Sequence, residues 1–403
     1  MTQANTLDFD IIVSGGGIAG MTAAAAFGNA GFSVLCVDPE PPVTTRDAAG
    51  SDLRSTAFLQ PARAFLDDIG LWTRLAPYAS DLQIMRIIDA GGETSEARLS
   101  KEFDAADISD LPFGWNLPNW LLRREMSAHL AGMSTVTHTT GVAATGLFTR
   151  SAEARVSLSD GRRLRCRLVV AADGRNSPMR QAAGIPVQTT RFGQKALAFA
   201  VTHAVPHHNV STEIHRTGGP FTLVPLPDHE GLPSSAIVWM EEGPKALELL
   251  HMDEVEFTQA VNLRSCGVLG QLTLASHRTI WPIISQHAER LNGERIALVA
   301  EAAHVVPPIG AQGLNMSLAD LKCLRDLAST VPDELGSPAM LADYHKARIK
   351  DVRLRVSGIS LLNRTSMLSA RPLRDARAAG LNALYSFEPL RKSIMQMGLG
   401  ARG

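Results

Sequence analysis

The strongest constraint on the fold is a glycine-rich turn near the start of the chain. An apolar run at residues 11–13 leads into Gly15, Gly17 and Gly20, which have the G-x-G-x-x-G spacing, and then into an alanine-rich stretch. A second apolar run ends at Asp38, 18 residues after Gly20. This order predicts a strand, a tight turn, a helix and a second strand that ends in an acid.

The residue types at this turn suit a bound dinucleotide. Gly15 permits the tight turn, Gly17 lets the backbone approach a pyrophosphate, and Gly20 lets the helix pack closely on the strand. The helix N-terminus offers N–H groups and a partial positive charge to the phosphates. Asp38 is placed to accept a hydrogen bond from a ribose hydroxyl. We therefore predict nucleotide binding at this turn.

A membrane span or a signal peptide is the alternative, because the chain carries no charged residue between Asp10 and Asp38. Six glycines dilute the hydrophobicity of this stretch, however. In addition, no Lys or Arg precedes Arg46, so the basic region of a signal peptide is missing. These two observations favour nucleotide binding over membrane insertion.

The composition excludes several other classes of protein. The 403 residues are 45% apolar and 20% charged, which is typical of a globular protein with two or three domains. A net charge of −1 gives no attraction to nucleic acid. The four cysteines lie far apart and the histidines lack metal-binding spacing, so we expect no disulfide framework, no metal site and a reducing, cytoplasmic location.

The order of apolar runs and turns predicts an α/β fold with an insertion. The chain up to residue 185 has mixed α/β patterning, whereas short β-prone runs separated by Pro- and Gly-rich turns follow it. We expect a discontinuous Rossmann-like domain at 1–185 and 286–340, and an inserted β-sheet substrate domain with α+β character at 186–285. The remaining segment, 341–403, is expected to be helical.

Two further motifs carry chemistry. Asp173-Gly174 follows an apolar run at residues 168–172. Asp-Gly is a common turn, but an acid at the carboxyl end of a buried strand lies where open α/β sheets bind ligands. In the stretch 300–315, Gly310 and Gly313 line the approach to a predicted helix N-terminus, which could stabilise an anionic ring edge.

Together these motifs resemble the class A flavoprotein monooxygenases, the para-hydroxybenzoate-hydroxylase-like family, and most closely its ubiquinone-biosynthesis hydroxylase branch. The resemblance extends from Phe9 to about Arg355. The third motif of this family is usually G-D-x-x-H-x-x-x-P-x-x-G-Q-G-x-N. Asp52-x-Arg54 and the helix that begins near Arg123 match two further family elements.

The resemblance implies that the first motif holds the ADP half of FAD and that Asp173-Gly174 touches FAD and the reductant NAD(P)H. The third motif would hold the ribityl chain and the flavin ring. The residues assigned to FAD in this way are Gly15, Gly17, Gly20, Asp38, Arg54, Arg123, Asp173, Gly174, Glu301, Gly310, Gly313 and Asn315.

One position departs from the family pattern. Ala300-Glu301 stands where the family has Gly-Asp, so the carboxylate is kept but one methylene is added. We therefore expect FAD to bind, with partial loss of FAD during purification.

The activity implied by the resemblance is hydroxylation of an electron-rich aromatic ring with NAD(P)H and O₂, most closely a polyprenyl phenol in ubiquinone biosynthesis. No catalytic dyad is evident, so the catalytic residues remain unassigned. His304 and Pro308 are the candidates in the flavin motif, and we expect both to shape the loop there rather than to transfer protons. Phe221, Leu223 and Trp239 are substrate-pocket candidates that suit the core equally well.

Two other functions remain open. One is a catabolic phenol hydroxylase or another flavin oxidoreductase of the same fold, such as a reductase or a halogenase. The halogenase motif W-x-W-x-I-P is absent, and only Trp115-Asn-Leu-Pro118 resembles it. The other is a non-catalytic flavin-binding subunit of a quinone-synthesis complex, which the departure at Glu301 would permit.

The C-terminal segment suggests contact with a membrane. Residues 341–403 hold twelve Lys or Arg against four Asp or Glu, a net excess of eight, together with apolar runs at 359–362 and 394–399. A basic, partly apolar tail suits the surface of an anionic membrane at the inner face. The alternative is a helix that docks on the cofactor domain with its basic face in water.

Overall fold

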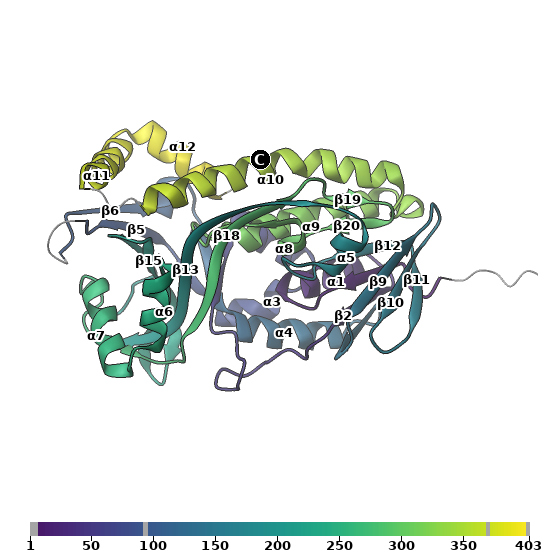
Figure 1. Ribbon diagram of the computed structural model, residues 1–403, viewed down its shortest axis with the longest axis horizontal. Helices are drawn as coiled ribbons and strands as arrows, with labels where there is room; N and C mark the ends of the chain where they lie inside the picture. Colours follow the sequence, from purple (N-terminus) through teal and green to yellow (C-terminus); the bar gives the residue numbers. More distant parts are fainter. Residues whose placement is uncertain (1–6, 92–95, 368–370, 400–403) are drawn as a thin grey trace, which may run out of the picture.

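The computed structural model describes residues 7–91, 96–367 and 371–399 (Figure 1). Its first sheet has six strands in the order β19-β20-β12-β1-β2-β8. The inner strands pair in parallel, and β19 pairs with β20 in the antiparallel direction. These strands are β1 Ile11–Ser14, β2 Val34–Asp38, β8 Val136–Thr140, β12 Leu168–Ala171, β19 Asn292–Gly293 and β20 Ile296–Leu298.

The continuous apolar runs of this sheet follow from its environment. All residues of β1 and β12 are buried, because parallel strands are covered on both faces. The predicted Rossmann-like α/β arrangement is confirmed by this parallel order and by the helix that follows β1. The strand ends that matter for function, at Ser14, Asp38 and Ala171, therefore lie at one edge of the sheet.

The second sheet has nine strands in the order β21-β18-β13-β16-β15-β14-β5-β6, with β17 paired to β13. Strand β13 is 17 residues long and pairs with both β16 and β18 (Figure 1). The nine strands are β5 Ile84–Asp89, β6 Leu99–Asp104, β13 Val187–His203, β14 Val210–His215, β15 Pro220–His229, β16 Leu232–Glu242, β17 Leu272–Leu274, β18 Thr279–Ala288 and β21 His304–Val305.

This sheet extends beyond the segment 186–285 expected from the sequence. β5 and β6 come from the stretch assigned to the Rossmann-like domain, yet β5 pairs in parallel with β14. β21 pairs with β18, so the sheet also reaches His304. The pattern of residues within a strand does not specify which distant strand it pairs with. The order of residues alone therefore assigned β5, β6 and β21 to the Rossmann-like domain.

Two three-stranded sheets complete the β-structure of the described residues. They are β3-β7-β4, with β3 Ser55–Leu59, β4 Ser80–Leu82 and β7 Gly114–Pro118, and β11-β10-β9, with β9 Ala144–Thr149, β10 Ala154–Leu158 and β11 Arg163–Cys166.

The helices of the first half are α1 Ile18–Asn29, α2 Gln60–Asp68, α3 Trp72–Leu75, α4 Asn119–Ala131 and α5 Pro178–Ala182. Those of the second half are α6 Gly243–His251, α7 Glu254–Arg264, α8 Ala300–Ala303, α9 Gln312–Thr330, α10 Pro338–Ser366, α11 Arg371–Ser386 and α12 Glu388–Leu399. Three short 3₁₀ turns are Ala76–Tyr78, Ala105–Asp107 and Pro332–Glu334.

Helix α10 spans most of the length of the molecule (Figure 1). It packs on α9 and on β18, and from Ile349 onward its buried side chains recur every three or four residues, as one face of a helix requires. Helix α11 lies beyond its end and packs near β6, whereas α12 runs back over α10, so that Gly398 reaches Gln312 (Figure 1). Within the described residues, no helix is both long and apolar enough to cross a membrane.

Candidate functional site

The glycine turn between β1 and α1 is shaped by close packing. Gly15 has φ +103°, and a Cβ there would lie 2.4 Å from the carbonyl oxygen of Ala172. A Cβ on Gly20 would lie 1.8 Å from the carbonyl oxygen of Gly15. At Gly17, in contrast, no described atom beyond its chain neighbours lies within 4 Å of the position of a Cβ. Gly15 and Gly20 thus allow close packing of the backbone, whereas Gly17 leaves open space beside the helix N-terminus.

Asp38 braces this turn from the end of β2. Its Oδ2 accepts a hydrogen bond from the Gly16 amide at 2.6 Å, and its Oδ1 accepts one from the Glu40 amide at 2.9 Å. A carboxylate has about four lone-pair positions, so a ribose hydroxyl could still donate to it. The position therefore suits both the turn and the ribose expected there.

Helices α1 and α4 run side by side in the same direction. The Ser127 hydroxyl contacts Met21 Sδ at 3.6 Å near the start of α1. Further along, Met133, just after α4, lies 3.0 Å from where a Cβ on Gly28 would stand. The two contacts advance in the same sense along both chains, which fixes the direction.

This arrangement brings Arg123 level with the glycine turn. Arg123 lies one helical turn before Ser127, so it stands beside the N-terminus of α1, where Gly17 is the N-cap residue. Its Nε is buried and has no hydrogen-bond partner within the described residues. A guanidinium with an unused buried donor beside a helix N-terminus suits the pyrophosphate of FAD.

Asp173 lies against the same turn, because its Cα is 2.9 Å from where a Cβ on Gly15 would stand. Its Oδ2 accepts hydrogen bonds from the Ser14 hydroxyl at 3.3 Å and from the Met179 amide at 3.1 Å. Its Oδ1 is buried without a partner in the part of the chain that the structure describes. Burial raises the pKa of this carboxyl despite those hydrogen bonds. The unused Oδ1 can accept a donor from a ligand.

Arg54 forms the next part of the site. Its guanidinium donates to both carboxylate oxygens of Asp52, at 2.8 and 2.7 Å, and lies 5.4 Å from the ring centre of Trp281. Asn119 also donates to Asp52, at 3.0 Å. The hydrogen bonds to Asp52 raise the pKa of Arg54, and the negative charge of Glu301 acts in the same direction. Arg54 thus connects the Rossmann-like part to Trp281 on β18.

Glu301, the departure from the family pattern, is paired in this structure. Its Oε2 lies 3.2 Å from Nε of Arg175, a residue that the sequence analysis missed although it directly follows Asp173-Gly174. Its neighbour Ala300 has φ +53°, in the left-handed region. A left-handed backbone explains why the family motif has glycine at this position.

A second alanine replaces a motif glycine. Counting back from Gly313, the family spacing places its preceding glycine at position 311, where this chain has Ala311 with φ +56°. The match assigned to Gly310 is therefore displaced by one residue, although Gly310 also has a positive φ of +62°. Ala311 is the N-cap of α9, which explains why the backbone turns sharply there.

The side chain of Asn315 makes its hydrogen bonds within the protein. Its side-chain amide donates to the carbonyl oxygens of Ala57 and Ala311, at 2.7 and 2.6 Å. Its Oδ1 accepts from the Leu59 amide at 2.8 Å. The bonds to Ala57 and Leu59 join α9 to β3, and the bond to Ala311 closes the first turn of α9, so this residue holds the helix start rather than pointing at a ligand.

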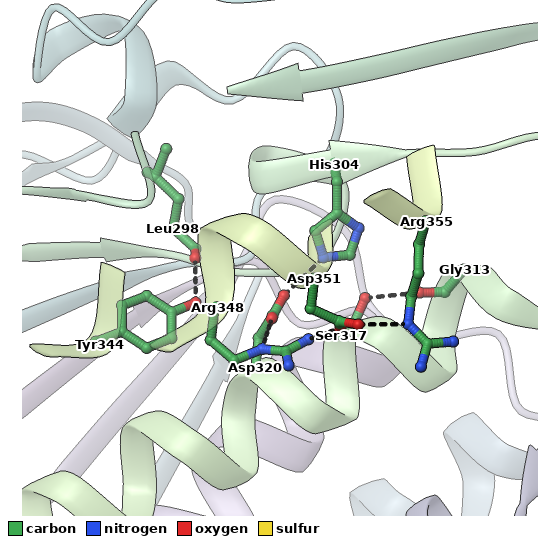
Figure 2. A network of polar contacts seen from close by, with 9 residues as sticks. All are labelled: Leu298, His304, Gly313, Ser317, Asp320, Tyr344, Arg348, Asp351 and Arg355. Carbon is green, nitrogen blue, oxygen red and sulfur yellow. Dashed lines mark hydrogen bonds and ion pairs between the residues drawn. The ribbon is translucent and has the colours of Figure 1, made fainter. Parts of the chain in front are cut away.

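The two flavin-motif candidates lie in different surroundings. We call residues 304–312 the flavin loop. His304, at its start, is 2% exposed, and its Nε2 lies 2.6 Å from Oδ2 of Asp320 on α9 (Figure 2). Asp320 also accepts from Nε of Arg348 on α10 at 2.6 Å. Pro308 is exposed in the middle of the loop. His304 thus hydrogen-bonds within the protein at the start of the loop.

The substrate-pocket candidates Phe221, Leu223 and Trp239 lie on the face of the second sheet that packs against α6 and α7. Their side chains are 0–5% exposed. Because side chains alternate along a strand, their neighbours lie on the opposite face. There, a second cluster packs with Ile309 of the flavin loop and includes Ala196, Val238, Met240, Trp281 and Ile283.

A family model described as "FAD binding domain" matches residues 8–356. The chain is 31% identical to "Ubiquinone hydroxylase UbiL" of Rhodospirillum rubrum over 394 residues, 97% of this chain and 89% of that one. It is 25% identical to the "3-demethoxyubiquinol 3-hydroxylase" of Escherichia coli, covering 97% and 98%.

A similar fold occurs in the crystal structure of p-nitrophenol 4-monooxygenase PnpA from Pseudomonas putida, with a TM-score of 0.79, 20% identity and 98% coverage of both chains. The matching family model, the full-length relatives and the shared fold agree with one another. The chain therefore belongs to the FAD-binding-domain family and is an FAD-dependent aromatic hydroxylase.

Proposed function

We propose that this enzyme hydroxylates a polyprenylated phenol, a precursor of ubiquinone, with NAD(P)H and O₂. One oxygen atom of O₂ enters the ring. The other is reduced by two electrons from NAD(P)H, takes up two protons and leaves as water. The observation that carries the proposal is the apolar face of the second sheet that meets Ile309 of the flavin loop. The curated relatives named ubiquinone hydroxylases, which align along nearly their whole length, support the substrate class.

The residues around the glycine turn would hold the FAD. The α1 N-terminus and Arg123 would bind the pyrophosphate, and Asp38 would accept from the ribose. Asp173 and Glu301 would face the ribityl chain, and the N-terminus of α9 would lie at the ring edge. When bound, FAD supplies the reduction of O₂ and the transfer of one oxygen atom.

The remaining residues would orient the substrate and keep water out. The wall that includes Val238, Met240 and Trp281 offers apolar surface to an aromatic ring. Arg54, half-exposed beside Trp281, stands at the edge of this wall and could orient a phenol oxygen. Ile309 of the flavin loop packs against these apolar side chains and would limit the entry of water.

Turnover with a defined substrate tests the proposal. The FAD-loaded enzyme is mixed with NADH or NADPH, O₂ and a phenol with or without a prenyl chain, and the products are identified by mass spectrometry. We expect faster NAD(P)H oxidation and one added oxygen atom with the prenylated phenol. Preference for the plain phenol would instead support a catabolic hydroxylase. FAD binding with no phenol-stimulated oxidation would indicate the non-catalytic subunit and overturn the proposal.

We also propose that α12 rests on an anionic membrane at the inner face, where such a substrate resides. Phe387 and, along α12, Leu390, Ile394 and Met397 recur at intervals of three and four residues and are 39–61% exposed. They form one apolar face. The net positive charge of residues 341–403 suits anionic lipids.

Flotation with anionic vesicles tests this contact. A double variant, Leu390→Ser with Ile394→Ser, should recover several-fold less protein with the vesicles than the unaltered enzyme does. The matched control is Val255→Ser with Leu263→Ser on α7, which removes apolar side chains that are even more exposed, at another place. Equal recovery of both variants and the unaltered enzyme would exclude the membrane and leave another enzyme of a quinone-synthesis complex as the partner of this face.

A further inference from the structure

Both ends of the flavin loop are connected to one face of α10. At the start of the loop, His304 bonds to Asp320, and Asp320 accepts from Arg348 on α10 (Figure 2). At the other end, Oε1 of Gln312 accepts from Nη1 of Arg355, also on α10, at 2.6 Å. The loop is therefore braced at both of its ends by the same helix.

The connection along α10 is continuous. Arg348 donates to Oδ2 of Asp351 at 2.9 Å, and Arg355 donates to Oδ1 of Asp351 at 2.9 Å (Figure 2). The three residues are spaced by three and four, so they share one face of the helix. We call Arg348, Asp351 and Arg355 the α10 ladder. It joins His304 to Gln312 through charge-assisted hydrogen bonds.

The two ends of the ladder differ in burial. The side chain of Asp320 is fully buried and that of Arg348 is 13% exposed, whereas the side chain of Arg355 is 29% exposed. Breaking a buried ion pair leaves an uncompensated charge and is strongly destabilising. The Arg348 end is thus needed for folding, and the Arg355 end can be altered with less effect on the fold.

Gln312 lies where the flavin loop enters α9. It is the first residue of α9, directly after Ala311 with its left-handed backbone. Its side-chain amide donates to the carbonyl oxygens of Gly310 at 2.9 Å and Gly398 at 3.3 Å. A side chain that holds the loop, α12 and Arg355 together fixes where the first turn of α9 points.

We propose that Arg355 is a positioning residue for the flavin ring: it holds Gln312, and through it the first turn of α9, and adds a positive charge at that helix N-terminus. The proposal rests on the placement of the flavin ring edge at the start of α9. A fixed cation and the partial positive charge of a helix N-terminus both favour a negatively charged ring. Arg355 would therefore raise both the affinity for FAD and the ease with which the bound flavin is reduced.

Variants of Arg355 separate this role from a purely structural one. Arg355→Gln removes the charge and the reach to Gln312, and Arg355→Lys keeps the charge. The control is Arg353→Gln on the same helix, whose guanidinium donates, within the described residues, to the Glu289 carbonyl oxygen. FAD affinity is measured by fluorescence quenching in apoprotein, flavin reduction by potentiometric titration, and apoprotein stability by thermal melting.

We expect Arg355→Gln to weaken FAD binding by about tenfold, the effect of one lost charge-assisted hydrogen bond. Its flavin should have a lower reduction potential. Arg355→Lys should recover most of the potential, and Arg353→Gln should match the unaltered enzyme in both readouts. A lower melting temperature with unchanged FAD affinity and potential would overturn the proposal. These readouts need no aromatic substrate, so a failure of the proposed function would not be mistaken for a failure of this inference.

Discussion

The carboxylate of Glu301 lies 3.2 Å from the guanidinium of Arg175, so α8 is tied to the loop that follows Asp173. Arg54 is close enough for the charge of Glu301 to raise its pKa. The carboxylate of Glu301 thus has a partner within this chain, and bound FAD would compete with Arg175 for it.

Shortening this side chain should strengthen FAD binding. Glu301→Asp moves the carboxylate away from Arg175 and restores the residue of the family motif. We expect an FAD dissociation constant about fivefold lower, or roughly 1 kcal/mol, and more flavin retained on purification. The flavin-to-protein absorbance ratio measures this, with Glu294→Asp at the exposed surface as the control. Flavin content near zero for every variant, even with excess FAD, would contradict FAD binding itself.

Replacing the two left-handed alanines should stabilise the protein. Ala300 and Ala311 have φ of +53° and +56°, and a left-handed backbone costs a residue with a Cβ about 1–2 kcal/mol. Glycine removes this cost but gains roughly 0.5–1 kcal/mol of freedom in the unfolded chain. We expect each variant, Ala300→Gly and Ala311→Gly, to gain about 0.5 kcal/mol in urea unfolding.

The control for these variants is Ala302→Gly, in the same short helix but without a positive φ. It should lose about 1 kcal/mol, because glycine is unfavourable in an ordinary helical conformation. Destabilisation by all three substitutions would show that the strain at Ala300 and Ala311 does not limit stability.

The buried carboxyl of Asp173 should reduce the stability of the folded protein while it contributes to FAD binding. Burial raises the pKa of this carboxyl above its ordinary value of 3.8, so the folded protein binds its proton more tightly than the unfolded chain does. Stability is therefore lost as pH rises from 3.8 through the raised pKa. Asp173→Asn removes this loss and keeps an acceptor for the Met179 amide.

Thermal melting of apoprotein from about pH 4 to pH 8 tests this. We expect the advantage of Asp173→Asn to grow with pH and then level off, while FAD affinity falls. Asp160→Asn is the control: hydrogen bonds from Arg162 lower the pKa of Asp160, so this variant should lose stability by an amount that stays constant once the pH is well above 3.8. An advantage that shrinks as pH rises would refute the assignment.

The two faces of the second sheet should respond differently to substitution. Val238 lies on the face with Ile309, so Val238→Phe should raise the KM for the phenol about tenfold with little change in FAD affinity. Leu223 lies in the core beside α6 and α7, so Leu223→Ala should cost about 3 kcal/mol of stability with an unchanged KM. Steady-state kinetics and urea unfolding distinguish the two. If Leu223→Ala raised the KM and Val238→Phe only lowered stability, the substrate would be assigned to the other face of the sheet.

Local signals made the Rossmann-like part predictable. The steric need at Gly15 and Gly20, and the acid at the end of β12, are properties of neighbouring residues, so the sequence carries them directly. The second sheet was predicted incompletely because β5 meets β14 across more than a hundred residues. Arg355 and Gln312 are likewise 43 residues apart, and nothing local in either segment specifies their contact.

Strand β13 has a mechanical consequence. Its first residues pair with β18 near the Rossmann-like part, and its last residues pair with β16 and β17 deep in the second sheet. One strand therefore spans both halves of the enzyme, and its pairing with β18 shifts register between Arg191 and Lys195, where a bulge lets the strand bend. The inserted sheet is not a transplantable module: excising residues 186–285 would leave β14 without its partner β5, and such an unpaired strand edge is prone to aggregation.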